Sequence, residues 1–479
     1  MNEMRKQSVG SREMRLSHLV PGRSVLAYGP AALLLCVIAA LWAWSQSGAP
    51  SLVGAAILIA FVIACWVFGI FAEPVTSFIF ILLVVLFHIS KPEVVLSGFT
   101  SPAWWLVFGG SIIAIAVQTT GLGRRLAGTL FARSGGSYPR AVAAVALAAV
   151  GLAFVMPSTN GRILLLTPIV LAFAEHLGLG PGRPGHTGLV VTVAAASYMP
   201  PTTILPANVP NSILLGASQS LYGIELTYGP YLLLHFPILG ALKTAALIWL
   251  VCRLFPEPGP LNVAAVGDPG PMSAQEKRLT ALLLLSLLLF ATDFIHGISP
   301  AWISLGTGIL CMLPPITLVT PKAFSERINL SMLVYIGGIL GLGAVVSDTG
   351  LGQLVAARLM AWAHLTSGHT VLNLATLFGI GAGLGALVTA TGLPAVLTPL
   401  AKEFADASGL PLLTVLMLQV PVFSTVFLPF ESPPMMVGLQ VGGVSPRPAG
   451  KLCLALAAVT LVVLLPLDYL WWRLLGYLP

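Results

Sequence analysis

Two short polar stretches interrupt apolar parts of this 479-residue chain and hold the side chains best suited to ligand chemistry. The first, PSTNGR, covers residues 157–162, and the second, TATG, covers residues 389–392. Their hydroxyl and amide groups can bind carboxylate or sulfate oxygens, and Gly161 and Gly392 let the backbone turn close to a ligand. Helices that begin after such stretches direct N–H groups and the positive end of their dipole at an anion. Carbonyl groups released at the same breaks suit a sodium ion.

The surrounding elements have the composition of a polytopic all-α membrane protein. The chain is 57% hydrophobic and only 8% charged, whereas soluble domains carry about 25% charged residues. We predict about eleven spans, each near the 20 residues that cross a bilayer. Their cores are 25–44, 51–71, 74–90, 103–120, 187–216, 230–254, 278–297, 300–317, 331–348, 411–440 and 450–475. The net charge of +7 encodes orientation in the lipid bilayer rather than a nucleic-acid partner.

Residues 140–178 and 371–405 are apolar stretches broken near their middles by the two polar sequences. We interpret both as re-entrant hairpins, since a broken backbone at membrane depth must line a cavity or lie within protein. Most basic residues fall on the side of the basic N-terminus, which places that end in the cytoplasm and the C-terminus across the inner membrane. Five spans separate the hairpins, so they enter from opposite faces.

The two halves of the chain repeat one another. TGLGRRLA at 120–127 is echoed by TGLGQLVA at 349–356, and ILPANVPN at 204–211 by FLPFESPP at 427–434. Together with the odd span count, these echoes predict an inverted-topology repeat, an architecture of secondary transporters. The predicted parts are a basic N-terminus (1–24), scaffold spans (25–130), a transport half (131–255), a linker (256–277), scaffold spans (278–360) and a second transport half (361–479).

The sequence LSGFTSPAWWLVFGGSIIAIAVQTTGLGRRLA at 96–127 resembles the fourth-span signature of the divalent anion:sodium symporter family, which carries dicarboxylates, citrate and sulfate. The resemblance extends from about residue 60 to the C-terminus. It implies eleven spans, two opposed hairpins, a homodimer built on the scaffold spans, and a transport domain that moves as an elevator.

The same resemblance implies where substrate and cation bind. The family's Ser-Asn-Thr at each hairpin tip contacts substrate carboxylates beside sodium. The predicted substrate residues are Ser158, Thr159, Asn160, Gly161, Arg162, Thr389, Thr391 and Gly392. The predicted cation residues are Asn160, Asn208, Asn211, Thr391, Glu431 and Ser432. Ala390 and Met435 lack polar groups that the family carries, which implies a weak or missing cation site on the second side.

Two charged residues inside the predicted membrane region, Arg162 and Glu431, could each have more than one role. Arg162 either pairs with an anionic substrate, as a guanidinium can do bidentately, or pairs internally with a carboxylate or carbonyl. Glu431 either binds a cation, carries a proton, or forms an ion pair with Arg162. Lys243 lies midway in an apolar run, and Asp293 and Asp468 lie near span ends; we interpret these three as charges without a functional role, with Asp293 wet and Asp468 snorkelling.

These patterns predict a secondary active transporter for a small anion, a di- or tricarboxylate or a sulfate-like oxyanion, with sodium as coupling ion. Proton coupling and anion exchange on the same fold are the alternatives. An intramembrane enzyme would need clustered acids, bases or metal ligands, and a channel would need a continuous polar stripe along its pore helices. No cofactor is predicted besides the coupling ion.

Overall fold

The computed structural model describes residues 22–132, 136–258, 261, 270–363, 365–387 and 389–478, and these are helical with no strand among them. In the first half the helices are α2 (Gly22–Gln46), α3 (Ser51–Phe68), α4 (Glu73–Leu86), α5 (Pro92–Val95), α6 (Ser97–Thr100), α7 (Pro102–Thr120), α8 (Leu122–Ala132), α9 (Tyr138–Val155), α10 (Thr159–His176), α11 (Pro184–Tyr198), η1 (Pro200–Thr203), η2 (Leu205–Ala207), α12 (Val209–Tyr222), α13 (Tyr228–His235), the π-helix η3 (Phe236–Leu242) and α14 (Lys243–Leu254).

In the second half the helices are α15 (Ala274–Ala291), α16 (Asp293–His296), α17 (Pro300–Met312), α18 (Pro321–Arg327), α19 (Leu330–Asp348), α20 (Leu351–Ala363), α21 (Thr370–Leu387), α22 (Leu393–Leu397), η4 (Thr398–Leu400), α23 (Ala401–Ser408), α24 (Leu412–Ser424), η5 (Pro429–Glu431), α25 (Pro433–Val441), α26 (Pro446–Val459), the π-helix η6 (Thr460–Leu464) and α27 (Leu465–Leu474). Within the described residues, six helical stretches are long and apolar enough to cross a membrane. The predicted all-α fold with several apolar helices is therefore confirmed, whereas the count of eleven spans and the two re-entrant hairpins stay predictions.

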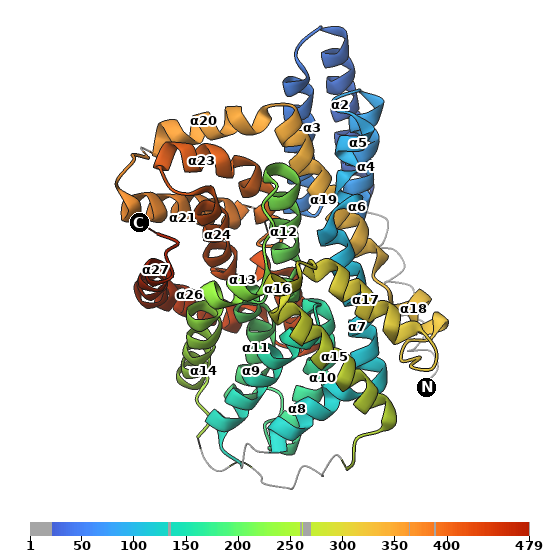
Figure 1. Cartoon of the computed structure of the whole chain (residues 1–479), viewed down its shortest axis with the longest axis vertical. Helices are drawn as coiled ribbons and strands as arrows, with labels where there is room; N and C mark the ends of the chain where they lie inside the picture. The colour runs from blue at the N-terminus through green and yellow to red at the C-terminus, as the bar shows by residue number, and fades with distance from the viewer. Residues whose placement is uncertain are drawn as a thin grey trace, which may run out of the picture.

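The order of elements repeats between the halves. In each half a long helix ends at a glycine of positive φ, Gly121 or Gly350, and a shorter helix follows. Next come a helix pair with a polar tip, a helix broken in its middle, and a last helix that contains a π-helical turn. Figure 1 shows α8 at the lower end of the molecule and α20 near its upper end. The sequence echoes thus mark corresponding elements of two structural units.

Glycine stripes bring the scaffold helices into backbone contact. A Cβ on Gly341 of α19 would lie 2.1 Å from the carbonyl oxygen of Val95, and one on Gly98 would lie 2.1 Å from that of Gly337. On α7, a Cβ at Gly109 would lie 2.5 Å from the backbone nitrogen of Leu305 in α17. Small residues allow such approach between helices in lipid, where packing rather than water exclusion drives association.

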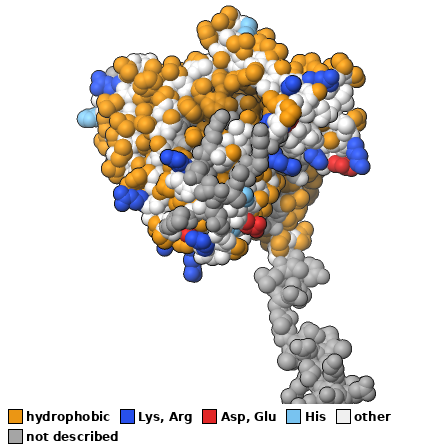
Figure 2. Space-filling model, turned by 90° about the horizontal axis from the view of Figure 1, so that it is seen from below, with side chains coloured by type: hydrophobic (Ala, Val, Ile, Leu, Met, Phe, Trp, Pro, Cys, Tyr) orange, Lys and Arg blue, Asp and Glu red, His pale blue; other side chains and the backbone are white. Residues whose placement is uncertain are grey.

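The linker is fastened at both ends. Arg125 in α8 forms an ion pair with Glu276 at 2.7 Å and donates to the carbonyl oxygens of Gly270 and Pro271. Glu276 also completes a capping box with Ser273 at the start of α15. At the other end, Glu257 pairs with Arg183. Seen from below in Figure 2, the surface is largely hydrophobic with basic side chains dispersed over it.

The two predicted span cores at 187–216 and 411–440 are each interrupted. The first consists of α11, the 3-10 turns η1 and η2, and α12. The second consists of α24, non-helical backbone from Thr425 to Leu428, η5 and α25. Helical hydrogen bonding is therefore interrupted at two breaks within these spans as well as at the two polar tips. Backbone N–H and carbonyl groups are free to bind other partners at these positions.

Candidate functional site

The first polar stretch forms the beginning of α10. Met156 is extended, Ser158 is the N-cap, and its hydroxyl accepts the backbone N–H of Gly161 at 3.1 Å. This bond satisfies one of the first-turn N–H groups that a helix leaves without an internal partner. Gly161 does not make the turn, because it lies inside α10; a Cβ there would lie 2.7 Å from the methyl carbon of Met156. The sequence argument for Gly161 as a turning residue was wrong, and close packing explains the glycine instead.

Arg162 is fully buried, with 0% of its surface exposed, and its guanidinium bonds only to neutral oxygens. Nη1 donates to the carbonyl oxygens of Met156 at 2.6 Å and Ala207 at 3.0 Å. Nη2 donates to the carbonyl of Ser197 at 2.8 Å, to Oδ1 of Asn208 at 3.0 Å and to Oγ1 of Thr159 at 3.2 Å. Two alternatives were open for Arg162, and in the structure the side chain makes the internal one: it pairs with carbonyl groups of the protein.

Asn208 and Asn211 lie at the break between η2 and α12. The hydroxyl of Thr159 donates to Oδ1 of Asn208, whose Nδ2 donates to the carbonyl of Tyr198 at 2.9 Å. Nδ2 of Asn211 donates to the carbonyl of Ile204 at 2.8 Å. The structure therefore brings three predicted site residues, Thr159, Arg162 and Asn208, into one buried hydrogen-bonded group.

The second tip bonds to the second break. The backbone N–H of Ala390 donates to the carbonyl of Glu431 at 2.8 Å, and Gly392 donates to Thr389 within the tip. The carboxylate of Glu431 accepts the backbone N–H groups of Phe427 and Leu428, both at 3.1 Å. Glu431 thus caps η5 with its side chain and holds the tip with its backbone.

The suggested ion pair between Arg162 and Glu431 is absent from the part of the chain that the structure describes. The ion pairs found there join Arg125 to Glu276, Arg183 to Glu257 and Lys322 to Glu326. In the same part of the chain, no hydrogen bond links the group around Thr159 to the group around Ala390. The two groups are connected through the packing of the broken helices.

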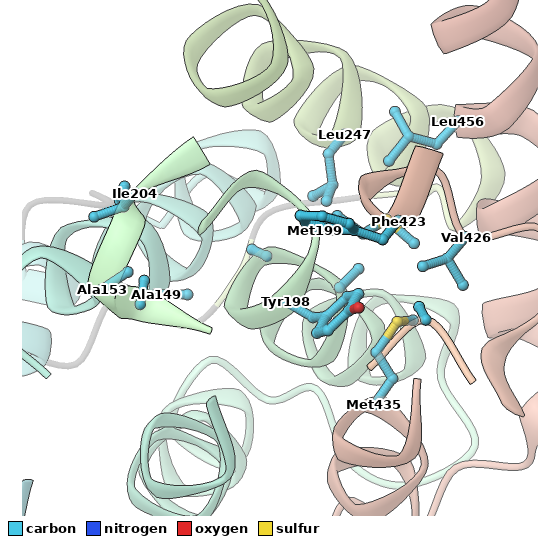
Figure 3. Packing of buried hydrophobic residues seen from close by; sticks show 14 of the residues in the cluster. Ala149, Ala153, Tyr198, Met199, Ile204, Leu247, Phe423, Val426, Met435 and Leu456 are labelled. Carbon is cyan, nitrogen blue, oxygen red and sulfur yellow. The ribbon is translucent and has the colours of Figure 1, made fainter. Parts of the chain in front are cut away.

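That packing crosses between the halves. Both α10 and α11 of the first half pack on α25 of the second, while α12 packs on α22. Gly438 in α25 makes this possible, because a Cβ there would lie 3.1 Å from Ile163 and 3.2 Å from Ala194. Figure 3 shows Tyr198 and Met435 side by side among buried apolar side chains of both halves. Met435 therefore fills space at the second break with an apolar side chain.

Unpartnered polar atoms gather at the same places. Oδ1 of Asn160 and Oδ1 of Asn211 are buried without a hydrogen-bond partner, as are the hydroxyl groups of Ser197, Tyr198 and Ser432. Each residue belongs to the first tip or to one of the two breaks. Other such atoms lie elsewhere in the described residues, for example in Tyr138, His235 and Asp468. Since buried polar atoms are almost always satisfied in proteins, those at the tip and breaks favour a ligand there.

Sequence reasoning missed several contributors. Met156, Ser197 and Ala207 act through backbone carbonyls, which no side-chain pattern reveals.

The three charged residues that the sequence analysis gave no functional role are buried. Lys243 is 1% exposed and donates to the carbonyl of Ser424 at 2.7 Å and to its hydroxyl at 3.2 Å. Asp293, expected to be wet, is 2% exposed and accepts the N–H of Tyr228, and Asp468, expected to snorkel, is 3% exposed. The mid-span position of Lys243 was the signal that merited more weight, since a charge there needs a partner.

Comparison with known proteins gives one family. A family model described as the sodium:sulfate symporter transmembrane region matches residues 31–478. A protein of Cupriavidus necator named only as a membrane protein is 27% identical over 395 residues, which cover 80% of this chain and 77% of the relative. The sodium-dependent dicarboxylate transporter SdcS of Staphylococcus saprophyticus is 21% identical over 436 residues, which cover 84% and 83% of the two chains.

A solved structure has a similar fold. The crystal structure of the Alcanivorax borkumensis YdaH transporter matches with a TM-score of 0.53 at 19% identity, over 80% of this chain and 88% of that one. At this identity the likeness concerns the fold alone. The overall helical fold is therefore similar to one already seen in a transporter.

Proposed function

The chain belongs to the sodium:sulfate symporter family of membrane transporters, and we propose that it carries a small oxyanion, a di- or tricarboxylate or sulfate, across the inner membrane together with sodium. It is a transporter rather than an enzyme. The N-terminus would lie in the cytoplasm, with the C-terminus on the opposite side. The substrate would bind between the tip at Ser158–Asn160 and the tip at Thr389–Gly392, where the notable donors are Thr389, Thr391 and the N–H groups of α10 and α22.

The observation that carries this proposal is the cluster of unpartnered buried atoms at the tips and breaks. In a lipid environment an unsatisfied polar group costs several kcal/mol, because no water reaches it. Hydroxyl donors on Ser197, Tyr198 and Ser432 suit an anion, and amide oxygens on Asn160 and Asn211 suit a cation. A site that offers both kinds of group favours binding of an anion with a cation beside it.

Sodium is supported as the cation by the names of the SdcS relatives and by the ligand chemistry of this site. The candidate ligands are Asn160, Asn211, Thr391 and Ser432, with carbonyl groups at the breaks.

The mechanism we propose is an elevator movement within a homodimer. The transport domain would consist of residues 131–255 and 361–479, and the scaffold of residues 25–130 and 278–360. The crossed packing of α10 and α11 on α25 supports movement of the two transport halves as one body. The close contact between α7 and α17 supports a scaffold shared by both halves. Trapping of a cysteine pair placed across the two domains, in two different positions of the cycle, tests this movement.

The function is tested by a thermal-shift screen of the purified protein against di- and tricarboxylates, sulfate and sulfonates. Each anion is added in sodium chloride and in choline chloride. We expect one class of dianion to raise the unfolding temperature in sodium but not in choline, because ligands that bind only the folded state stabilise it by mass action. Uptake into proteoliposomes that ignores both sodium and pH gradients would contradict symport.

A matched pair of variants ties the result to the site. Asn160→Ala removes an unpartnered amide at the first tip and is expected to lower uptake at least tenfold with little loss of stability. Asn329→Ala removes a surface N-cap that accepts from Met332, and is expected to lose about 1 kcal/mol of stability while keeping uptake per folded molecule. Equal uptake by the two variants would remove Asn160 from the site.

A further inference from the structure

The guanidinium of Arg162 has the surroundings of a bound cation rather than of an ion-paired side chain. Five oxygens surround its two terminal nitrogens at 2.6–3.2 Å, three from carbonyl groups, one from an amide and one from a hydroxyl. They come from three places in the chain: the end of α9 with the start of α10, the end of α11, and the end of η2 with the residue after it. None carries a negative charge.

This oxygen set is chemically that of a sodium site. Sodium is a hard cation bound by carbonyl, amide and hydroxyl oxygens, and unwound helices in transporters supply such carbonyls at half-helix C-terminal ends. Ser197 lies in the last turn of α11, where the helix dipole is negative. A positive charge is stabilised at this position whether it arrives from solution or belongs to the chain.

The second break has a related but smaller contact, made by a basic residue of the first half, Lys243 in α14. The ammonium of Lys243 donates to the carbonyl and the hydroxyl of Ser424, the last residue of α24, which is the half-helix that leads into the second break. Lys243 is 1% exposed and, among the described residues, forms no ion pair within 4.0 Å. Each half-helix end that enters a break is therefore held by a basic side chain of the protein itself.

We propose that Arg162 is a tethered cation that occupies an oxygen cage otherwise suited to sodium. Resting on the proposed function, this inference means that the chain supplies one of the positive charges that balance its dianion. The transported sodium then uses the remaining unpartnered oxygens, including Oδ1 of Asn160 and of Asn211. Coupling requires one sodium ion fewer than it would with an empty cage.

The test refills the cage after the side chain is removed. Arg162→Ala leaves the oxygens and a space of guanidinium size, so methylguanidinium and sodium are expected to bind there. The unfolding temperature of purified R162A in choline chloride is expected to fall by about 5–10 °C. Methylguanidinium at millimolar concentration is expected to restore at least half of that loss, and sodium a smaller part. Wild type is expected to gain nothing from methylguanidinium.

Two controls separate this result from a general effect. Arg183→Ala removes a guanidinium that bonds to Glu257 and to the carbonyl of Gly178 at an exposed position, so methylguanidinium is not expected to rescue it. Arg162→Met fills the space with an apolar chain, and rescue is expected to be lost. Should R162A not be recovered as folded protein, Arg162→Ser serves in its place, since its short side chain also leaves the space of the guanidinium open.

Failure of rescue in both R162A and R162S, or equal rescue of R183A, would overturn the tethered-cation proposal. Because the readout is thermal stability without substrate, this outcome leaves the transport proposal standing. Conversely, rescue of R162A in a protein that binds no anion would refute the proposed function alone.

Discussion

Asn208 is the residue whose loss is expected to damage the candidate site most. Its side chain makes three hydrogen bonds: it accepts from Thr159 and from the guanidinium of Arg162, and it donates to the carbonyl of Tyr198. Two neutral bonds contribute about 1 kcal/mol each and the charged bond about 1.5–3 kcal/mol. Asn208→Ala is therefore expected to lower the free energy of unfolding by about 3.5–5 kcal/mol, a large share of the roughly 5–15 kcal/mol typical of folded proteins.

Asn373 provides a matched control. It is 1% exposed and also makes three hydrogen bonds, to the backbone N–H and carbonyl of Thr366 and to the carbonyl of Ser408, but none has a charged partner. Asn373→Ala is expected to cost about 3 kcal/mol. Thermal and denaturant unfolding of both variants, followed by tryptophan fluorescence in the same detergent, measures the difference. If N208A lost no more stability than N373A, the charged contact with Arg162 would have no net value and the reasoning would be wrong.

The other predictions concern packing, pH and the second half. Gly341→Ala is expected to lose about 2–3 kcal/mol of stability, because the added methyl group would overlap a backbone oxygen that cannot move away. Gly128→Ala is the control, since no atom lies within 4 Å of its Cβ. Comparison of the unfolding temperatures of the two variants tests this prediction. The hydrogen bond with Arg125 lowers the pKa of Glu276 from 4.5 to about 2. Its stabilising effect is therefore complete above pH 4.5 and lost as the pH falls towards 2, and the stability advantage of wild type over Glu276→Gln should shrink over that interval. Lys243→Met removes both bonds to Ser424 and is expected to cost about 2–3 kcal/mol, read from its unfolding temperature.

The positions of the elements follow well from the sequence because helix-breaking residues and apolar length are local properties. Pro157 with Ser158, and Thr391 with Gly392, identify the two tips, and each tip is followed by the start of a helix. The internal echoes also pair the correct elements, such as the helices that follow Gly121 and Gly350. These features depend on residues close together in the chain, which sequence patterns report directly.

The partners of Arg162 could not be derived in the same way. Three of its acceptors are backbone carbonyls, which every residue possesses, and two of these lie 35 and 45 residues away. Only the fold selects which carbonyls reach the guanidinium. The role of Gly161 was also hidden, since its constraint comes from the far end of the Met156 side chain. The substrate and cation residues themselves stay predictions that the experiments above address.

The packing of first-half helices on a second-half helix has a consequence for synthesis and folding of the protein. The surfaces of α10 and α11 that contact α25 belong to a segment translated more than 240 residues before α25 is complete, at a synthesis rate of about 5–20 residues per second. During that interval α10 and α11 lack the second-half helix that packs on them in the complete fold. An insertion-assisting factor, or temporary shelter within the translocation machinery, would have its greatest effect on this early fragment.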